Sequence, residues 1–398
     1  MIRKYGIFFS LILVFVAMAG VTYLKNGDWS FLSPENLSNL SQQITQTGIL
    51  AIGMTLVILI GGIDLSVGSI VAVAGIMLAF TAEQFESAGA AAPYFAMLCA
   101  ILAGMALGAI NGGLIAGLGM IPFVVTLGML TIARGIAYLI TGSQSIRTKD
   151  PLFKTIGVDS IDKVLYRWIG GAPEAGAAQF PWFTVALAVL AFGAWLAFHL
   201  ASIRKSRRHG LPVEGGRETA FLIALVFAAF FFCGWVFAAH QGLPVMVLIL
   251  TVLAMVASFV LNRTPFGRHL YAIGGNREAA RLSGIRVQRC TFLVFTLMGF
   301  LCAISGIVST CRAQGAAPAT QGVLAELEAI AAAVVGGTSL MGGVGTIGGT
   351  LIGALIIGVV VNGMSIMALP NPVQLVFKGL IIVVAVWIDI KTKNRKSK

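Results

Sequence analysis

Few residues of this chain have the types and spacing that chemistry requires. Among the polar or charged residues that lie inside apolar stretches or at their ends, we consider Asp64, Asn111, Arg134, Asn362 and Lys378. A charge at the centre of a membrane costs about 2.5–3.5 kcal/mol, so each needs a partner or a position near the membrane surface. They are too few and too scattered for a proton relay, which argues against a proton-driven carrier.

The positions of these residues suggest different roles. Asp64 stands beside two glycines at the end of one span, where its carboxylate would cap the next helix through Ser66. Arg134 lies deeper, and its position fits either an ion pair or a cavity wall. Lys378 lies about five residues into the last span, which favours an anchoring role near the membrane surface. We take four of them as candidates for a solute path or for helix packing: Asp64, Asn111, Arg134 and Asn362.

The sequence contains none of the common catalytic patterns. It has no paired carboxylate site, no HExxH motif and no GxSxG nucleophile elbow. It also lacks the GxxxxGK[ST] phosphate loop, so any ATP that drives this chain is bound by another polypeptide. The five cysteines lie in or beside apolar spans without metal spacing, and the four histidines are dispersed. We therefore expect no enzymatic activity, no metal and no cofactor.

The most polar window runs from residue 262 to residue 289 and contains six arginines between two apolar spans. A short helix is predicted inside it. Asn276 is a favourable N-cap residue, Glu278 lies in the first turn, where the helix dipole favours an anion, and Gly284 is the residue type that ends a helix. The window is either a charged loop that fixes topology or a docking helix for a soluble partner.

The composition indicates repeated membrane spans. Of the 398 residues, 58% are hydrophobic and only 11% are charged, and 48 are glycine. The net charge of +12 arises mainly in four segments: the head before the first span, residues 204–217, the polar window and the tail 391–398. These segments fall on one side of the membrane if the spans alternate. The excess is therefore positive-inside bias and not a nucleic-acid surface.

We predict an all-α polytopic membrane protein with about 12 transmembrane helices and both termini in the cytoplasm. The spans are expected at 6–24, 44–60, 66–82, 94–118, 122–141, 181–201, 218–239, 243–261, 290–311, 323–341, 345–367 and 373–390. The first span is alternatively a cleaved signal peptide, because residues 17–19 read Ala-Met-Ala. The breaks near Gly61 and Met341 are rich in glycine, so broken helices are the alternative there.

Three loops complete the predicted organisation of this single transmembrane domain, residues 1–398. The loop 142–180 is expected outside the membrane, with a short amphipathic helix at Ile161 to Ile169, and it is either a connector or a landing surface for an external partner. The basic loop 202–217 and the polar window 262–289 are expected in the cytoplasm.

Glycine patterns indicate an internal repeat. GGxxLxxG occurs at residues 61–68 and again at 336–343. A ladder of small residues four apart occurs twice, at Gly104, Gly108, Ala109 and Gly113 and at Gly349, Gly353, Ala354 and Gly358. Small residues on one helix face allow close helix packing in a membrane, and a smooth lining for a solute path is the second interpretation. Repeated halves are common among transporters.

Several of these strings also resemble a known family. EAAxxxG at Glu278 to Gly284 resembles the docking signature of bacterial ATP-binding-cassette importer permeases, although the later Ile-x-Leu-Pro of that signature is missing. GGIDLSVGSIVAVAG (61–75), YAIGGNREAARLSGI (271–285) and the run 326–358 resemble the ribose, xylose and arabinose permeases, and most of all the xylose-transport type. The segment 160–240 adds two spans to the ten-helix pattern of that family.

The resemblance implies a function. Such permeases pair as homodimers in the bacterial inner membrane, receive a sugar from a periplasmic binding protein and dock cytoplasmic ATPase subunits. Carried over to this chain, the coupling residues are Gly274, Gly275, Asn276, Glu278, Ala279, Ala280, Arg281 and Gly284. The expected cargo is a pentose, D-xylose first, with ribose, arabinose, nucleosides or branched-chain amino acids as alternatives. The alternative from a different functional class is a secondary carrier or a channel.

Overall fold

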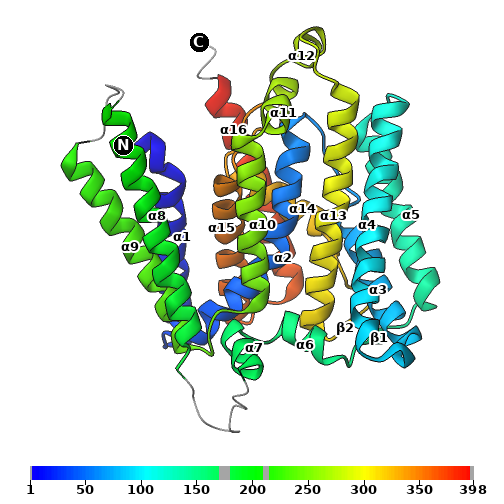
Figure 1. Ribbon diagram of the computed structural model, residues 1–398, viewed down its shortest axis with the longest axis horizontal. Helices are drawn as coiled ribbons and strands as arrows, with labels where there is room; N and C mark the ends of the chain where they lie inside the picture. Colours follow the sequence, from blue (N-terminus) through cyan, green and yellow to red (C-terminus); the bar gives the residue numbers. More distant parts are fainter. Residues whose placement is uncertain (1, 170–179, 209–214, 395–398) are drawn as a thin grey trace. The chain divides into compact units, whose positions relative to one another are not determined.

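The structure is a computed structural model that describes residues 2–169, 180–208 and 215–394. Helices dominate it, with one two-stranded sheet (Figure 1). The chain forms two compact units, which we describe separately: residues 1–31, 40–158 and 246–398 make the first, and residues 32–39 and 159–245 make the second. Parts of the predicted loops 142–180 and 202–217 and of the tail 391–398 lie outside the described residues.

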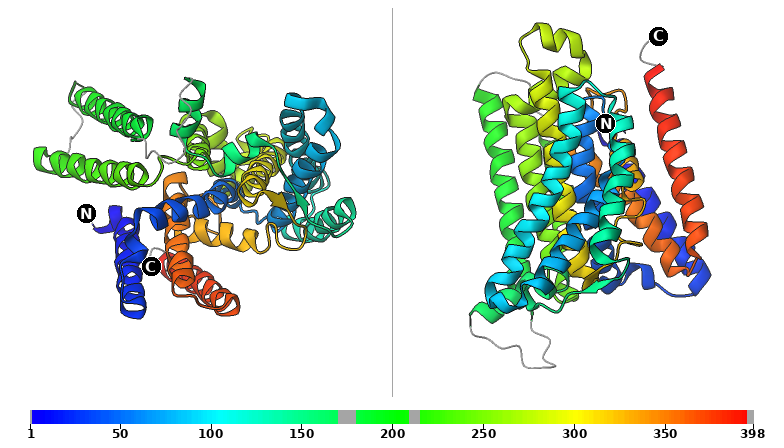
Figure 2. Two further views of the ribbon diagram at one scale, coloured as in Figure 1. Left: turned by 90° about the horizontal axis from the view of Figure 1, so that it is seen from below. Right: turned by 90° about the vertical axis from the view of Figure 1, so that its right-hand side faces the viewer.

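The first unit contains most of the helices, two of them in part. They are α1 (Ile2–Asn26), α2 (Pro34–Leu59), α3 (Val67–Gln84), α4 (Ala92–Gly117), α5 (Pro122–Thr141), α6 (Pro151–Gly157), α10 (Val245–Arg263), α11 (Pro265–Gly275), α12 (Arg277–Leu282), α13 (Val287–Ala313), α14 (Ala325–Val335), α15 (Ile347–Ile366) and α16 (Asn371–Asn394). Helix α2 belongs to this unit from residue 40, and helix α10 from residue 246. Two short strands, β1 (Ile146–Arg147) and β2 (Gly315–Ala316), pair antiparallel. Within this unit α12 lies at one end, and the two strands lie at the opposite end (Figures 1 and 2).

The predicted membrane character is confirmed. In the described part of the chain, ten helices are long and apolar enough to cross a membrane. The predicted span 323–341 is wrong in its form, because α14 has only 11 residues. Such a helix is about 16 Å long and does not cross a hydrocarbon core about 30 Å thick. Glycines with positive φ follow it at Gly337, Gly342 and Gly343, so the broken-helix alternative near Met341 is the one observed.

The glycine ladder of α4 packs against α13. A β-carbon added to Gly104 would lie 2.7 Å from the carbonyl oxygen of Gly299, and one added to Gly108 would lie 2.8 Å from the Cα of Gly299. Gly113, the last member of this ladder, has open space beside it. Two of these glycines therefore let the backbones of α4 and α13 touch, as close helix packing in membranes requires.

The second ladder lies on α15 and packs against α14. A β-carbon added to Gly353 would lie 2.7 Å from the amide nitrogen of Gly336 and would collide with the carbonyl oxygen of Ala332. Gly349 faces the carbonyl oxygen of Gly336 in the same way. The two ladders differ in context, because GGxxLxxG at 336–343 leads directly into its ladder helix, whereas the copy at 61–68 leads into α3, one helix earlier.

The second unit holds the additional pair of long helices, α8 (Trp182–Arg208) and α9 (Gly216–Ala239), and the short helix α7 (Ile161–Trp168). The amphipathic helix predicted at Ile161 to Ile169 is confirmed by α7. Buried Asp162 accepts hydrogen bonds from the amide nitrogens of Phe183 (2.9 Å) and Thr184 (3.3 Å) and from the Thr184 hydroxyl. A carboxylate at this place caps the start of α8 and ties α7 to it.

Candidate functional site

The polar window folds into two short helices, α11 and α12. Asn276 joins them, and its side-chain oxygen accepts a hydrogen bond from the amide nitrogen of Ala279 at 2.9 Å. Gly284 follows α12 with φ +86°, a backbone conformation that side chains with a β-carbon rarely adopt. The predicted helix, its N-cap and its terminating glycine are therefore confirmed.

The surface of α12 is charged. Glu278 and Arg281 form an ion pair of 2.6 Å, and both side chains are about two-thirds exposed, at 64% and 66%. The hydrogen bond and the charge of Arg281 lower the pKa of Glu278, and Glu278 in turn raises the pKa of Arg281. Both groups are thus charged at neutral pH, although exposed pairs contribute little to stability. Ala280 is buried on the opposite side.

The helix before α12 rests on both glycine-rich breaks. The amide nitrogen of Gly343 donates to the carbonyl oxygen of Leu59 at 3.0 Å, which joins the end of α2 to the segment after α14. Gly274 packs on this junction, and a β-carbon there would collide with the carbonyl oxygen of Leu59. The hydroxyl of Tyr271 donates to the carbonyl oxygen of Gly345 at 2.7 Å. Helix α11, which Asn276 joins to α12, therefore contacts the two places where helices are interrupted.

Asp64 and Asn111 meet in the core next to one of these breaks. One carboxylate oxygen of Asp64 accepts from the amide nitrogen of Ser66 (2.9 Å) and from its hydroxyl (2.6 Å). The side-chain amide of Asn111 donates to the same hydroxyl at 2.9 Å. Both residues are fully buried. Asp64 thus fixes the residue before α3, and Ser66 itself makes no side-chain cap.

We expect Asp64→Ala to lower the thermal unfolding temperature of the detergent-solubilised protein well below that of Asp64→Asn. Alanine leaves the Ser66 amide and hydroxyl without their acceptor, and each buried unsatisfied group costs about 1–3 kcal/mol. Asparagine retains the acceptor oxygen. Size-exclusion chromatography after heating gives the two midpoints. Equal losses in the two variants would contradict this role of the carboxylate oxygen.

Arg134 interacts electrostatically with Glu326 and also binds backbone groups. Its guanidinium donates to the backbone carbonyl oxygens of Pro318 (2.9 Å) and Gln321 (2.8 Å). It therefore holds the loop between β2 and α14 through backbone atoms. Asn362 is buried on α15. Gln321 is fixed from a second side, because its amide donates to the hydroxyls of Thr310 (2.7 Å) and Ser309 (3.0 Å) on α13.

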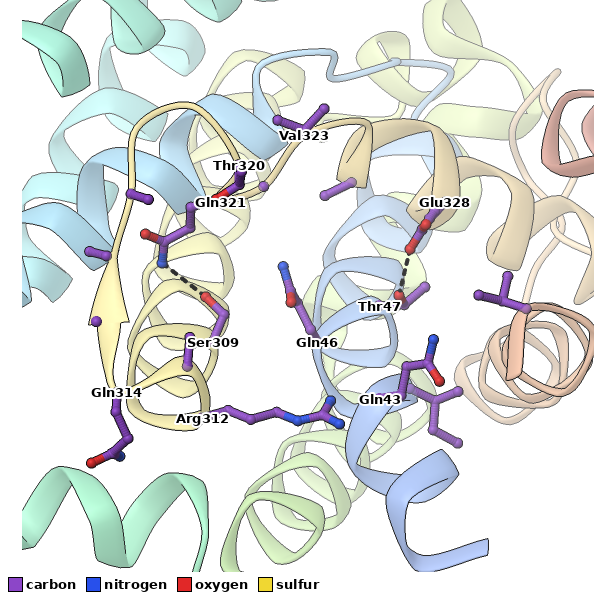
Figure 3. Close-up of a pocket in the computed structure, with 18 of the residues that line it drawn as sticks. Gln43, Gln46, Thr47, Ser309, Arg312, Gln314, Thr320, Gln321, Val323 and Glu328 are labelled. Carbon is purple, nitrogen blue, oxygen red and sulfur yellow. Dashed lines mark hydrogen bonds between the residues drawn. The ribbon is translucent and has the colours of Figure 1, made fainter. Parts of the chain in front are cut away.

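A cavity of about 740 Å³ lies beside this loop, in the end of the first unit that holds β1 and β2. Helices α2, α13, α14 and α15 form its walls together with the loop. Polar side chains from several of these elements converge on it (Figure 3): Gln43, Gln46, Thr47, Arg312, Gln321 and Glu328.

Some of the charged residues that line the cavity have an ion-pair partner in the described part of the chain, and others do not. Glu328 forms an ion pair of 2.6 Å with Lys378 of α16, and its other oxygen accepts from the Thr47 hydroxyl at 3.0 Å. Lys378 was expected to anchor its span near the membrane surface, but in the structure it pairs with Glu328 inside the protein. Arg312 and Arg147 also line the cavity, and neither side chain has a partner among the described residues.

The sequence analysis did not predict this cavity, although Ala354 and Gly358 of the second ladder line it, as the solute-path interpretation of that ladder expects. None of the eight path or packing candidates, all of which are described residues, lines it: Asp64, Gly104, Gly108, Asn111, Arg134, Gly349, Gly353 and Asn362. A further signal was available. Gln43, Gln46 and Thr47 lie at helical spacing in the polar first half of α2, which puts three polar groups on one face of this helix.

Comparison with known proteins identifies relatives along almost the whole chain. Residues 36–386 match the family described as branched-chain amino acid transport system / permease component. The chain is 37% identical to the xylose transport system permease protein of Escherichia coli strain K12 over 389 residues, covering 96% of this chain and 93% of the relative. It is 35% identical to the xylose transport system permease protein of Haemophilus influenzae, covering 98% and 97%.

A ribose permease is similar as well. The chain is 33% identical to the ribose import permease protein of Haemophilus influenzae over 375 residues, covering 94% of this chain and 90% of the relative. No solved structure matches the chain. These relatives are named as permease proteins of xylose transport or of ribose import, and each is matched over at least 90% of its length.

Proposed function

The chain belongs to the branched-chain amino acid transport system / permease component family, and on that basis we propose that it is the membrane permease subunit of an ATP-driven sugar importer. The observation that carries the proposal is the position of α12. It is an exposed, capped helix whose neighbour α11 packs through Gly274 onto Leu59 and Gly343. A soluble motor that grips α12 would therefore move the interrupted helices.

In this mechanism the chain carries no catalytic group of its own. A separate ATP-binding-cassette ATPase docks on the segment from Gly274 to Gly284 and closes when it binds ATP. Closure moves α11 and α12 as a rigid handle. The handle pushes on the junction between Leu59 and Gly343, and α3 and α15 then tilt at the breaks that precede them. The path switches from outward to inward access.

The remaining assignments follow the same proposal. The protein is a multi-pass protein of the bacterial inner membrane, with α12 and both termini in the cytoplasm and a second permease copy beside it. The start of α1, the end of α16 and α12 lie at one end of the first unit, which supports this topology (Figure 1). A periplasmic sugar-binding protein delivers the cargo, which we take to be D-xylose because two xylose permeases are among the relatives.

Reconstitution tests the proposal. The permease is placed in liposomes together with an ATPase subunit and a sugar-binding protein of the same organism. Uptake of radiolabelled xylose, ribose, arabinose, a nucleoside and leucine is then measured with ATP inside the liposomes. We expect pentose uptake that stops with a hydrolysis-dead ATPase. Uptake by the permease alone under an ion gradient would identify a secondary carrier, and uptake of leucine or a nucleoside in place of a sugar would correct the cargo.

A further inference from the structure

We propose that the cavity between α2, α13, α14 and α15 is a transit site at which a neutral sugar binds weakly on its way through the permease. The inference rests on the proposed function, and it assigns that function a place in the structure. The site consists of the amides of Gln43 and Gln46, the Thr47 hydroxyl, the Arg312 guanidinium and the carboxylate of Glu328.

The chemistry of the wall matches a polyhydroxylated solute. Each sugar hydroxyl both donates and accepts a hydrogen bond, so a matching wall needs donors and acceptors close together. Gln43 and Gln46 supply both kinds of group from one face of α2. Arg312 extends from α13 into the space opposite them (Figure 3). A guanidinium offers a planar fork of donors, which fits two neighbouring sugar oxygens.

The charge balance argues against cationic and zwitterionic solutes. Glu328 is the one carboxylate among the described residues that line the cavity, and Lys378 already neutralises it at 2.6 Å. Arg312 and Arg147 have no partner there, so the cavity is net positive. An amino acid would bring an ammonium group that needs a free carboxylate, because an unpaired buried charge is costly. The wall has none to offer, whereas a neutral sugar needs none.

The same wall predicts low affinity. Aromatic faces supply large contact areas and much of the binding energy at specific sites. No aromatic side chain is among the described residues that line the cavity. The volume of about 740 Å³ also lies well within the range of pockets that accept whole drug-sized ligands, so a single pentose fills only part of it. A solute held by hydrogen bonds in a wide polar space leaves readily, which suits a transit site.

Two measurements on the assembled importer test this site. Arg312→Gln is expected to lower xylose uptake into proteoliposomes about tenfold while ATP hydrolysis stimulated by the loaded binding protein stays within about twofold of wild type. Arg217→Gln removes the same charge from an exposed position at the start of α9 and is expected to leave both values unchanged. Arg312→Lys, which keeps the charge without the fork, is expected to fall between them and decides the case if the glutamine variant does not assemble.

The second measurement is equilibrium binding of labelled xylose to the permease in nanodiscs without the binding protein. We expect saturation only at millimolar xylose concentrations, and a dissociation constant below about 10 µM would overturn the transit role. If the Arg312→Gln variant takes up xylose as fast as the wild type, the site is overturned but the proposed function is not. A wild-type importer that moves no sugar would overturn the proposed function and, with it, this inference.

Discussion

Replacing Gly274 with alanine is expected to lower ATP-driven uptake about tenfold or more while the protein remains inserted in the membrane. A β-carbon at this position would collide with the carbonyl oxygen of Leu59 and would lie 2.9 Å from the Cα of Gly343. Both neighbours are backbone atoms, so no side-chain rotation relieves the contact. Overpacking of this kind costs about 1–3 kcal/mol, and about 1.4 kcal/mol already corresponds to a factor of ten in rate.

Gly275 provides the matched control for this prediction. It is the next residue, belongs to the same resemblance motif and has open space beside it. Gly275→Ala is therefore expected to retain uptake within about twofold of wild type. Uptake and ATP hydrolysis are measured together on the reconstituted importer, and quantitative blotting of membranes gives the amount of inserted permease. Equal behaviour of the two variants would mean that the contact of α11 with Leu59 and Gly343 does not transmit motion.

The helix α12 was predictable because its determinants are local. Asn276, Glu278 and Gly284 lie within nine residues, and each acts on the backbone of the same short helix. The long apolar helices were predictable for a similar reason, since span length and hydrophobicity are properties of a single segment. The caps of α12 and the class of the chain therefore followed from the sequence.

The form of α14 was not predictable in the same way. Residues 323–341 are mostly apolar, with Glu326 and Glu328 as the charged exceptions, but only Ala325 to Val335 are helical. The following glycines adopt positive φ, and Gly343 donates its amide to Leu59, almost three hundred residues away in the sequence. Apolar composition describes where a segment lies. It does not record whether distant backbone groups will satisfy a break in the helix.

The cavity escaped prediction for a related reason. Its walls come from α2, α13, α14 and α15 and from the loop before α14, and these meet only in the folded chain. The pair of Glu328 and Lys378 shows the difficulty, because Lys378 alone suggested an anchor near the membrane surface and nothing in the sequence marked Glu328 as its partner. Arg134 is a similar case, because the carbonyl groups of Pro318 and Gln321 to which it donates cannot be identified from the sequence.

Replacing Gly108 with leucine is expected to remove most of the folded permease from the membrane. The backbones of α4 and α13 touch along Gly104, Gly108 and Gly299, and the space that a leucine needs at residue 108 is filled by the carbonyl oxygen of Phe295 and by Gly299. Helices in a membrane gain their association from close packing, since lipid supplies no hydrophobic drive between them. Separation of α4 from α13 therefore loses the contacts that hold the core of the first unit.

Gly113→Leu is the matched control, because it introduces the same side chain at a position without the backbone contact. Gly113 lies on the same helix and has nothing within 4 Å of an added β-carbon, so leucine there is expected to leave the folded yield near wild type. Fluorescence-detected size-exclusion chromatography of fusion proteins measures the yield, and we expect at least a fivefold difference, equivalent to about 1 kcal/mol or more. Overpacking by a leucine is expected to exceed that value. If both variants elute as folded protein in equal amounts, the α4–α13 contact is compliant, and the glycines serve the solute path or another purpose in place of packing.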